Sequence, residues 1–287
     1  MLDNLRQEYR QSLKSSDTEE HIDLAFYRPV GFMWAILCRK LGITPNAVTI
    51  VSIFLGVGAG ICFYYTDLWL NVLGIFLLIW ANSLDSADGQ LARLTKQYSR
   101  IGRILDGMAG DFWFISIYVC ICLRTNQTMP WFADHSWVVW TLAVAAGVCH
   151  AFQAAMADYY RQMHLQVVNG KSELEDSSAL SEKRAQARGL QKIIMSLYVG
   201  YTHCQEALTA NAQKLRRRGP LPAEFRQKSL PLMKWANVLT FNWRSITIAV
   251  TLLLGFPWVY FACELVLGNI ILAYMIARHE AACRSLL

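Results

Sequence analysis

Four aspartates stand within 27 residues of this sequence: Asp85, Asp88, Asp106 and Asp111. Asp85 and Asp88 are three positions apart, so on a helix both side chains point to one side. Ionised carboxylates this close repel one another, and one or two divalent cations would offset that repulsion. Because oxygen ligands suit hard cations, the spacing predicts a site for Mg²⁺ or Mn²⁺.

Small and basic residues surround these acids. Glycine leaves room for a ligand or another backbone to come close, and arginine together with a metal ion is suited to holding a pyrophosphate. The residues concerned are Gly89, Gly102, Gly107, Gly110, Arg93, Lys96, Arg100 and Arg103. The alternative is structural, with salt bridges between the aspartates and the basic residues closing a loop.

The elements that would carry these side chains are membrane-spanning helices. Hydrophobic residues make up 54% of the chain and charged residues only 17%, below the roughly one quarter usual in soluble domains. This composition excludes disorder, collagen and coiled coil. A spanning helix needs about 20 mostly apolar residues, and six segments are predicted to span, at 46–66, 68–94, 99–123, 136–163, 238–258 and 260–278.

The aspartates fall at the facing ends of the second and third predicted helices. An antiparallel hairpin of these two helices would bring both pairs to the same depth in the membrane. Ionised groups within a spanning segment are costly, so their presence there points to function. The fifth and sixth helices are joined almost directly, which predicts a second tight hairpin around Phe256 and Pro257.

The distribution of Lys and Arg predicts the orientation of these helices. In the six-helix layout, 26 of the 27 basic residues lie on one side of the membrane and only Arg124 lies on the other. Basic residues favour the cytoplasmic side. We therefore expect both termini and the aspartates on the cytoplasmic side of a multi-pass protein, more in keeping with a bacterial inner membrane than with an organelle. The net charge of +6 requires no nucleic acid partner.

The fold class expected is an all-α integral membrane protein with six transmembrane helices and an N-terminal interfacial helix. The first twenty residues are polar and predict no cleavable signal peptide. Residues 21–40 read as an amphipathic helix on the cytoplasmic interface, started or kinked by Pro29; a soluble helix packed on the loops is the alternative. The predicted division is a cytoplasmic N-terminus over 1–45 and a membrane domain over 46–287. That domain would carry a cytoplasmic insertion at about 165–235, with a helix near 181–216.

One stretch of the sequence resembles a known signature. Asp85-Ser-Ala-Asp88-Gly89-Gln-Leu-Ala92-Arg93 is followed after eight residues by Gly102 and after three more by Asp106. This resembles the signature D-x2-D-G-x2-A-R-x8-G-x3-D-x3-D of the CDP-alcohol phosphatidyltransferase family. The six-helix layout resembles that family over most of the chain, as does Gly42-Ile-Thr-Pro45-Asn46 before the first span.

The resemblance implies an enzyme of phospholipid synthesis. It would transfer a phosphatidyl group from a CDP-linked lipid such as CDP-diacylglycerol to an alcohol, with release of CMP. By position, Asp85, Asp88 and Asp106 would hold the metal, and Asp111 would share that set and act as the base for the incoming alcohol. The CDP moiety would be lined by Gly89, Ala92, Arg93 and Gly102. The resemblance also implies a homodimer.

The sequence departs from the signature at its last acid. The family's fourth Asp would fall on Gly110, whereas this chain carries Asp111, one residue later. On a regular helix that one residue turns the side chain by about 100°. A π-bulge would restore its direction, and Gly107-Met-Ala-Gly110 would permit one. We therefore predict a bulge or kink within 106–111; loss of activity or a different base is the alternative.

The acceptor alcohol is less well defined by the sequence. The fourth helix carries a polar stripe of His150, Gln153, Asp158 and Arg161, and the fifth begins with Asn242-Trp243-Arg244. Arg161 and Arg244 could form an anion pocket for a phosphorylated acceptor, or could be arginines that snorkel to the interface. The favoured acceptor is inositol or inositol phosphate, with choline, ethanolamine, glycerol phosphate and serine open. Rival classes are a transporter and a catalytically silent relative that binds CDP-lipid.

Overall fold

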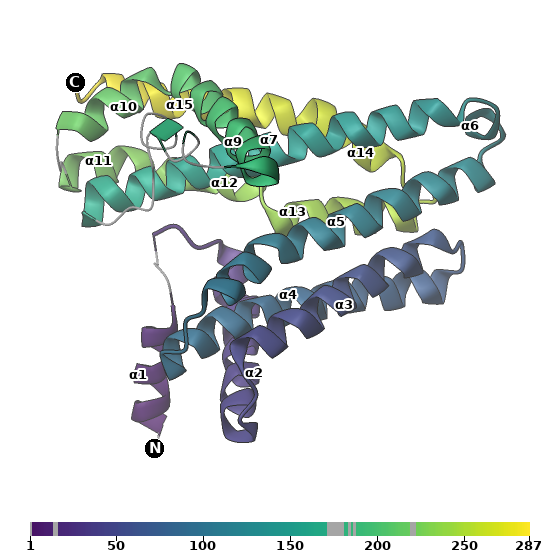
Figure 1. Cartoon of the computed structure of the whole chain (residues 1–287), viewed down its shortest axis with the longest axis horizontal. Helices are drawn as coiled ribbons and strands as arrows, with labels where there is room; N and C mark the ends of the chain where they lie inside the picture. Colours follow the sequence, from purple (N-terminus) through teal and green to yellow (C-terminus); the bar gives the residue numbers. More distant parts are fainter. Residues whose placement is uncertain (1, 14–16, 171–180, 183–184, 186–187, 219–221) are drawn as a thin grey trace. The chain divides into compact units, whose positions relative to one another are not determined.

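The computed structural model of the chain describes residues 2–13, 17–170, 181–182, 185, 188–218 and 222–287 (Figure 1). Throughout this part the regular elements are helices, which agrees with the all-α prediction. The chain divides into two compact units, Met1–Gly147 with Phe241–Leu265, and Val148–Thr240 with Val266–Leu287. The division at residue 45 expected from the sequence stays a prediction.

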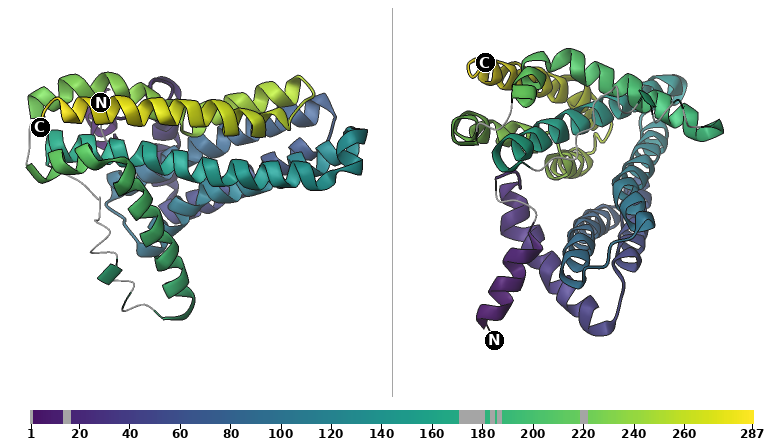
Figure 2. Two further views of the ribbon diagram at one scale, coloured as in Figure 1. Left: turned by 90° about the horizontal axis from the view of Figure 1, so that it is seen from above. Right: turned by 60° about the vertical axis from the view of Figure 1, so that its left-hand side comes forward.

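The first unit carries the N-terminal helices and the aspartates. Its elements are α1 (Leu2–Ser12), the π-helical turn η1 (Asp23–Tyr27), α2 (Arg28–Leu41), α3 (Pro45–Tyr64), α4 (Leu68–Thr95), α5 (Arg100–Thr128), α6 (Pro130–Asp134), the first part of α7 (Ser136–Asn169), α13 (Phe241–Leu253) and α14 (Val259–Cys263). In Figures 1 and 2, α3, α4 and α5 lie side by side. This bundle positions the candidate site.

Local sequence explains where these three helices begin. Thr44, Asp67 and Ser99 each precede a helix and accept a hydrogen bond from a backbone N–H in its first turn. The distances are 3.4 Å from the N–H of Ala47, 3.0 Å from that of Leu70 and 2.8 Å from that of Gly102. Such caps satisfy N–H groups that have no partner within the helix. The N-terminal end of α5 is therefore fixed seven residues before Asp106.

Two glycines let α3 approach α5 closely. A Cβ atom at Gly56 would lie 2.1 Å from the Trp113 ring, and one at Gly60 would lie 2.8 Å from the backbone nitrogen of Ile117. Small residues four positions apart allow such close packing of membrane helices. The buried side chains of Phe63, Trp113 and Ile117 belong to the core of this unit. This packing fixes α5 against α3, and so fixes Asp106 on α5.

Arg124, the basic residue predicted on the outer side, has a structural role. Its side chain is buried, and one guanidinium nitrogen donates to the carbonyl oxygens of Phe63 and Tyr65 and to the side-chain oxygen of Asn71, at 2.7–3.2 Å. The two carbonyls lie at the C-terminal end of α3, where helix carbonyls lack intrahelical partners. Arg124 therefore ties the ends of α3, α4 and α5 together opposite the aspartates.

The second unit contains the rest of the chain. Its elements are the second part of α7, α9 (Gly189–Leu208), α10 (Ala210–Arg218), α11 (Pro222–Ser229), the 3₁₀ turn η2 (Leu230–Leu232), α12 (Met233–Val238), most of the π-helical turn η3 (Glu264–Gly268) and α15 (Asn269–Arg284). The Glu280 carboxylate accepts hydrogen bonds from the backbone N–H groups of Asn211 and Ala212, at 2.7 and 3.2 Å. This cap holds α10 alongside α15 (Figure 2).

In the described part of the chain, five helices are long and apolar enough to cross a membrane. They are Pro45–Tyr64, Leu68–Thr95, Leu105–Thr128, Ser136–Val168 and Val259–Arg284. Exposed side chains such as Phe54 and Trp69 suit a lipid-facing surface. These spans match five of the six predicted segments. The predicted span 238–258 contains α13, whose 13 residues are about 20 Å long, shorter than the apolar core of a bilayer.

Other sequence predictions are confirmed in part. The helix expected over 21–40 is formed by η1 and α2, with Pro29 in the first turn of α2; its interfacial position stays a prediction. The hairpin around Phe256 and Pro257 is present as a turn between α13 and α14. The helix expected near 181–216 is represented in the described residues by α9 and α10, which are separated at Thr209.

Candidate active site

Three of the four predicted acids come together. Asp85 and Asp88 lie on α4 and Asp106 lies on α5, and one carboxylate oxygen from each residue lies within 4.8 Å of the other two. Asp88 is buried, Asp85 is half-buried and Asp106 is exposed. The group is therefore open on the α5 side and closed beneath Asp88, as expected of a site that a substrate must reach.

Thr49 holds the buried member of the group. Its hydroxyl, on α3, donates a hydrogen bond to the Asp88 carboxylate. Both side chains are at most 3% exposed. A buried carboxylate needs such a partner, because burying an ionised group without hydrogen bonds is costly. The three helices that pack together in this unit thus each contribute one polar side chain or more to the site.

The donor set fits a hard divalent cation. Three carboxylate oxygens are the ligands that Mg²⁺ and Mn²⁺ prefer. Oxygens on opposite sides of a Mg²⁺ ion are about 4.2 Å apart, since each Mg–O distance is about 2.1 Å. Adjacent oxygens are about 3 Å apart. The three carboxylate oxygens lie within 4.8 Å of one another, so they must move closer together to bind one ion. Small side-chain movements would bring the three oxygens into contact with one ion.

Asp111 is not a member of this group. The bulge predicted within 106–111 is wrong, because α5 is a regular α-helix from Arg100 to Thr128. On such a helix five residues correspond to a rotation of about 140°, so Asp111 leaves α5 in a different direction from Asp106. Asp111 is exposed. The role of Asp111 as a metal ligand therefore receives no support from the arrangement of the three carboxylates.

The predicted pocket glycines have different surroundings. Gly102 packs against α3, since a Cβ atom there would lie 2.3 Å from the Asn46 side-chain oxygen. Asn46 and Ser99 are hydrogen-bonded to each other through their side chains, at 3.1 and 3.2 Å. The three atoms nearest to a Cβ atom at Gly89 would all belong to the guanidinium of Arg93, the first at 3.4 Å. Gly102 thus permits a helix contact, whereas the space above Gly89 is occupied by a flexible side chain.

Arg93 is directed to the N-terminal helix. Its Nε atom donates to the backbone carbonyl of Ser12 at 2.5 Å. Its Nη2 atom is buried and has no hydrogen-bond partner in the described part of the chain. The alternative drawn from the sequence was that arginines near the aspartates form salt bridges with them. Arg93 instead donates to a backbone carbonyl of α1. The side chains of Arg100 and Arg103 lie outside the described residues.

The two arginines predicted for the acceptor belong to different units. Arg244 of α13 donates from Nε and Nη2 to one oxygen of Glu264, at 3.0 Å each, and both side chains are 5% exposed. Arg161 of α7 donates to the side-chain oxygen of Asn237 in α12. Both arginines are engaged by protein groups, and their joint role in an acceptor pocket stays a prediction.

Sequence reasoning assigned no role in the site to three polar residues that shape it: Thr49, Asn46 and Ser99. Thr49 offered a signal, because it is a polar residue in the first turns of an otherwise apolar predicted span. Ser99 was also recognisable as a helix cap before Gly102. Their contacts with Asp88 and Gly102 were not, since they depend on how α3 packs against the hairpin of α4 and α5.

Comparison with known proteins agrees with this geometry. Residues 42–204, more than half of the chain, match the family model of the CDP-alcohol phosphatidyltransferases. A curated relative is the CDP-diacylglycerol–glycerol-3-phosphate 3-phosphatidyltransferase of Cereibacter sphaeroides, 33% identical over 88 residues. The aligned stretch covers 30% of this chain and 39% of the relative. With its carboxylate signature gathered on α4 and α5 inside the matched region, the chain belongs to the CDP-alcohol phosphatidyltransferase family.

Proposed function

We propose that the protein transfers a phosphatidyl group from a CDP-linked lipid, such as CDP-diacylglycerol, to an alcohol. The alcohol oxygen forms a bond to the phosphorus that carries the lipid. The bond from that phosphorus to the bridging oxygen breaks, and CMP leaves with the electron pair. The observation that carries this proposal is the group of three carboxylates at the positions of the family signature. A transporter would not need this donor set at one depth.

Asp85, Asp88 and Asp106 would hold Mg²⁺ or Mn²⁺, as one ion or two. Such a metal would neutralise charge on the pyrophosphate and on the leaving CMP. The protein's part is to present three carboxylate oxygens from two helices and to fix the buried one through Thr49. Because the exposed member, Asp106, lies on α5, the pyrophosphate would approach from the α5 side.

Asp111 is the proposed base for the acceptor hydroxyl. Two observations support a base that does not bind the metal. Asp111 lies outside the group of three, and its side chain is exposed. A carboxylate that does not bind the metal keeps its negative charge available for the proton of the acceptor hydroxyl. A hydroxyl whose own pKa is far above neutrality needs such a positioned acceptor to attack efficiently.

The CDP moiety would lie along Gly89, Ala92, Arg93 and Gly102, on the α4–α5 hairpin. Gly89 and Ala92 lack long side chains, so the backbone of α4 can come close to a ligand. Arg93 would need to turn from the Ser12 carbonyl to meet a phosphate, and its unpartnered Nη2 would then gain one. This assignment rests on the positions of these residues in the signature.

The acceptor class we propose is a small polyol or its phosphate. The sequence favoured inositol or inositol phosphate, whereas the name of the C. sphaeroides relative specifies glycerol 3-phosphate. A phosphorylated acceptor would be recognised by an arginine, for which Arg161 and Arg244 are separate candidates. Inositol phosphate and glycerol 3-phosphate share a hydroxyl for attack and an anionic group for recognition, whereas inositol offers hydroxyl groups alone.

The proposed topology has six membrane crossings with both termini and the active site in the cytoplasm, in a bacterial inner membrane, with the protein as a homodimer. Five crossings correspond to the helices long enough to span, and α13 with the turn after it would make the sixth. Support comes from the one-sided distribution of basic residues. Reporters that are active only in the cytoplasm, fused in turn before Met1 and after Leu287, would test the even number of crossings.

CMP release in detergent micelles tests the function. Each reaction would contain the protein, CDP-diacylglycerol, Mg²⁺ or Mn²⁺, and one acceptor. The acceptors tested in turn would be glycerol 3-phosphate, inositol phosphate, inositol, choline, ethanolamine and serine. We expect CMP with a polyol or polyol phosphate and not with the amino alcohols. No CMP with any acceptor, together with retained CDP-lipid binding, would contradict the proposal and identify a silent relative.

A further inference from the structure

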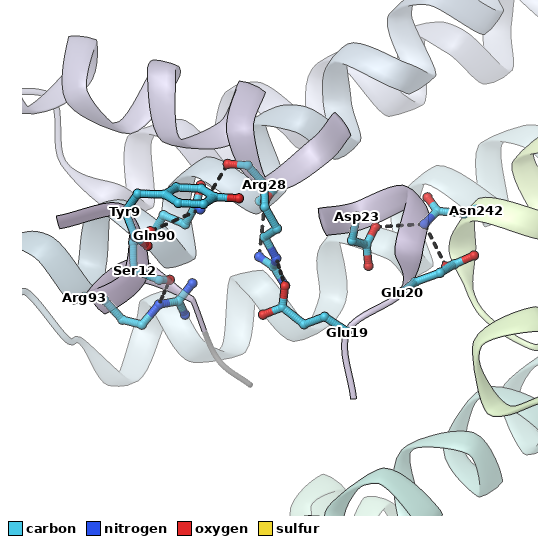
Figure 3. Close-up of polar contacts among 10 residues, drawn as sticks. Tyr9, Ser12, Glu19, Glu20, Asp23, Arg28, Gln90, Arg93 and Asn242 are labelled. Atoms are coloured by element: carbon cyan, nitrogen blue, oxygen red, sulfur yellow. Dashed lines mark hydrogen bonds and ion pairs between the residues drawn. The ribbon is translucent and has the colours of Figure 1, made fainter. Parts of the chain in front are cut away.

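The N-terminal segment is bonded to the helix that carries the signature (Figure 3). On α4, Gln90 donates from Nε2 to the Ser12 hydroxyl of α1 at 3.3 Å and to the Arg28 carbonyl of α2 at 3.1 Å. Arg28 in turn donates from Nη1 to Ser86 of α4 at 3.1 Å, and from Nε to the Glu19 carboxylate at 2.9 Å. We call these contacts the N-terminal latch.

The latch is buried. Gln90 and Ser12 are 0% exposed, and Gly31 of α2 packs directly on the same place. A Cβ atom at Gly31 would lie 2.8 Å from the Gln90 side-chain oxygen and 2.9 Å from the Ser86 hydroxyl. Buried hydrogen bonds are costly to leave unmade, so the two bonds from Gln90 Nε2 favour this contact, although the Gln90 side-chain oxygen has no hydrogen-bond partner in the described part of the chain. Arg93 adds a further bond from the same face of α4 to the Ser12 carbonyl.

The latch and the carboxylates occupy two faces of one helix. Ser86, Gln90 and Arg93 are spaced by four and three residues and share a stripe, from which Asp85 is turned by about 100° and Asp88 by almost half a turn. The N-terminal segment therefore contacts α4 on a different face from the one that carries the carboxylates. Of the two faces, Thr49 of α3 holds the carboxylate side and the latch holds the other.

Two features set the latch apart from the signature. Ser86 and Gln90 stand at positions that the signature leaves open, and the segment they bind precedes residues 42–204, which match the family. The same N-terminal segment also reaches α13, where Asn242 donates to the carboxylates of Glu20 and Asp23 at 2.8 Å each. Asn82 of α4 donates to the Asn242 side-chain oxygen at 3.3 Å.

We propose that Gln90 is a positioning residue, through which the N-terminal segment fixes the rotation of α4 and so the distance from Asp85 and Asp88 to Asp106. The inference rests on the proposed function, because it assigns to Gln90 the positioning of ligands of the same metal site. Metal affinity depends on the separation of ligand oxygens, and residues that orient ligands change it when substituted. A rotation of α4 by a few degrees would move both of its carboxylates relative to α5.

The test compares Gln90→Leu with Gln97→Leu in the full chain. Leucine is similar in size to glutamine but makes no hydrogen bonds, and Gln97 is exposed just beyond α4. Mn²⁺ binding is measured by electron paramagnetic resonance, and thermal unfolding and CMP release are measured on the same samples. We expect the Mn²⁺ Kd of Gln90→Leu to rise at least about threefold, less than the tenfold or more typical of residues that bond directly to a ligand. The rate at saturating Mn²⁺ should stay within about twofold, and Gln97→Leu should match the unaltered protein.

Ser12→Ala provides a second, milder variant on the N-terminal side of the latch. It removes the hydroxyl that accepts a hydrogen bond from Gln90, so it should also raise the Mn²⁺ Kd. If Gln90→Leu does not fold, Ser12→Ala still tests the inference. Unchanged Mn²⁺ Kd in Ser12→Ala and in any folded Gln90→Leu, with only lower thermal stability, would overturn the positioning role. If the unaltered protein binds neither Mn²⁺ nor Mg²⁺ and releases no CMP, the proposed function fails, and the inference fails with it.

Discussion

The hydroxyl of Thr49 is hydrogen-bonded to the carboxylate of Asp88, and this bond joins α3 to α4 beneath the three gathered acids. Asp88 is 3% exposed, so its carboxylate depends on protein partners. The bond occupies one of the two carboxylate oxygens and orients the other. The buried acid is thereby held in place before a metal ion or substrate arrives.

Replacing Thr49 tests this orientation. Thr49→Val keeps the shape of the side chain and removes the hydroxyl, so the concentration of Mn²⁺ that gives half-maximal CMP release should rise about tenfold. Thr49→Ser keeps the hydroxyl and should stay near the unaltered value. Equal metal dependence for Thr49→Val and the unaltered protein would show that Asp88 needs no support from α3.

Gly102 has two candidate roles, and a double substitution separates them. In Gly102→Ala the new Cβ would displace the Asn46 side chain and break its bond with Ser99, at a cost of about 1 kcal/mol. Adding Asn46→Ala should cost little more stability, because the two effects share one contact. Thermal unfolding in detergent measures both.

Activity of the same variants tests the nucleotide pocket. If Gly102 also lines the CDP moiety, Gly102→Ala with Asn46→Ala should keep a raised KM for CDP-diacylglycerol, while Asn46→Ala alone should not. A normal KM in the double variant would limit Gly102 to helix packing.

Asp111 should affect the rate and leave metal binding unchanged. Asp111→Asn removes the proposed base, so turnover at saturating Mn²⁺ should fall at least about 100-fold. The Mn²⁺ Kd should not change, because Asp111 lies outside the group of three. Asp106→Asn serves as the comparison and should weaken Mn²⁺ binding. Full turnover in Asp111→Asn would mean that another group accepts the proton.

The buried pair of Arg244 and Glu264 should behave as a unit. Arg244→Met leaves an unpaired buried carboxylate and should lower the free energy of unfolding by about 3–5 kcal/mol. Arg244→Met with Glu264→Leu should recover a large part of this loss. Thermal unfolding of both variants, with Lys40→Met as an exposed control, decides the point. No loss in the single variant would show that the pair adds nothing to stability.

The helices were predictable because their signals are local. Long apolar runs predict α3, α4, α5 and α7, and the caps Thr44, Asp67 and Ser99 are typical helix starts. The 238–258 segment misled because its apolar run continues past the end of α13. Gly255 adopts a left-handed backbone conformation with φ of 81°, which ends the helix before Pro257.

The predicted bulge failed for a different reason. It was inferred from the displaced Asp111, on the assumption that all four acids must face one point. The structure instead forms π-helical turns at Asp23–Tyr27 and Glu264–Gly268. At the second turn the Cα of Gly268 packs against the Gln153 side chain, a tertiary contact with no local sequence signal.

The candidate site was partly predictable. The signature placed Asp85, Asp88 and Asp106 in one group, and the structure brings them together. The supporting contacts were not predictable, because Thr49 and Asp88 are 39 residues apart and Ser12 and Gln90 are 78 apart. Pairings at such separations follow from helix packing, which a single sequence does not specify.

CMP release from CDP-diacylglycerol with the metal controlled tests the central claim most directly. The unaltered protein and Asp88→Asn would be assayed in EDTA and then with added Mg²⁺ or Mn²⁺, with a polyol phosphate as acceptor. The account predicts no CMP in EDTA, recovery with metal in the unaltered protein, and at most a trace with metal in Asp88→Asn. Undiminished CMP release in EDTA, or a fully active Asp88→Asn, would contradict a metal site built from these carboxylates.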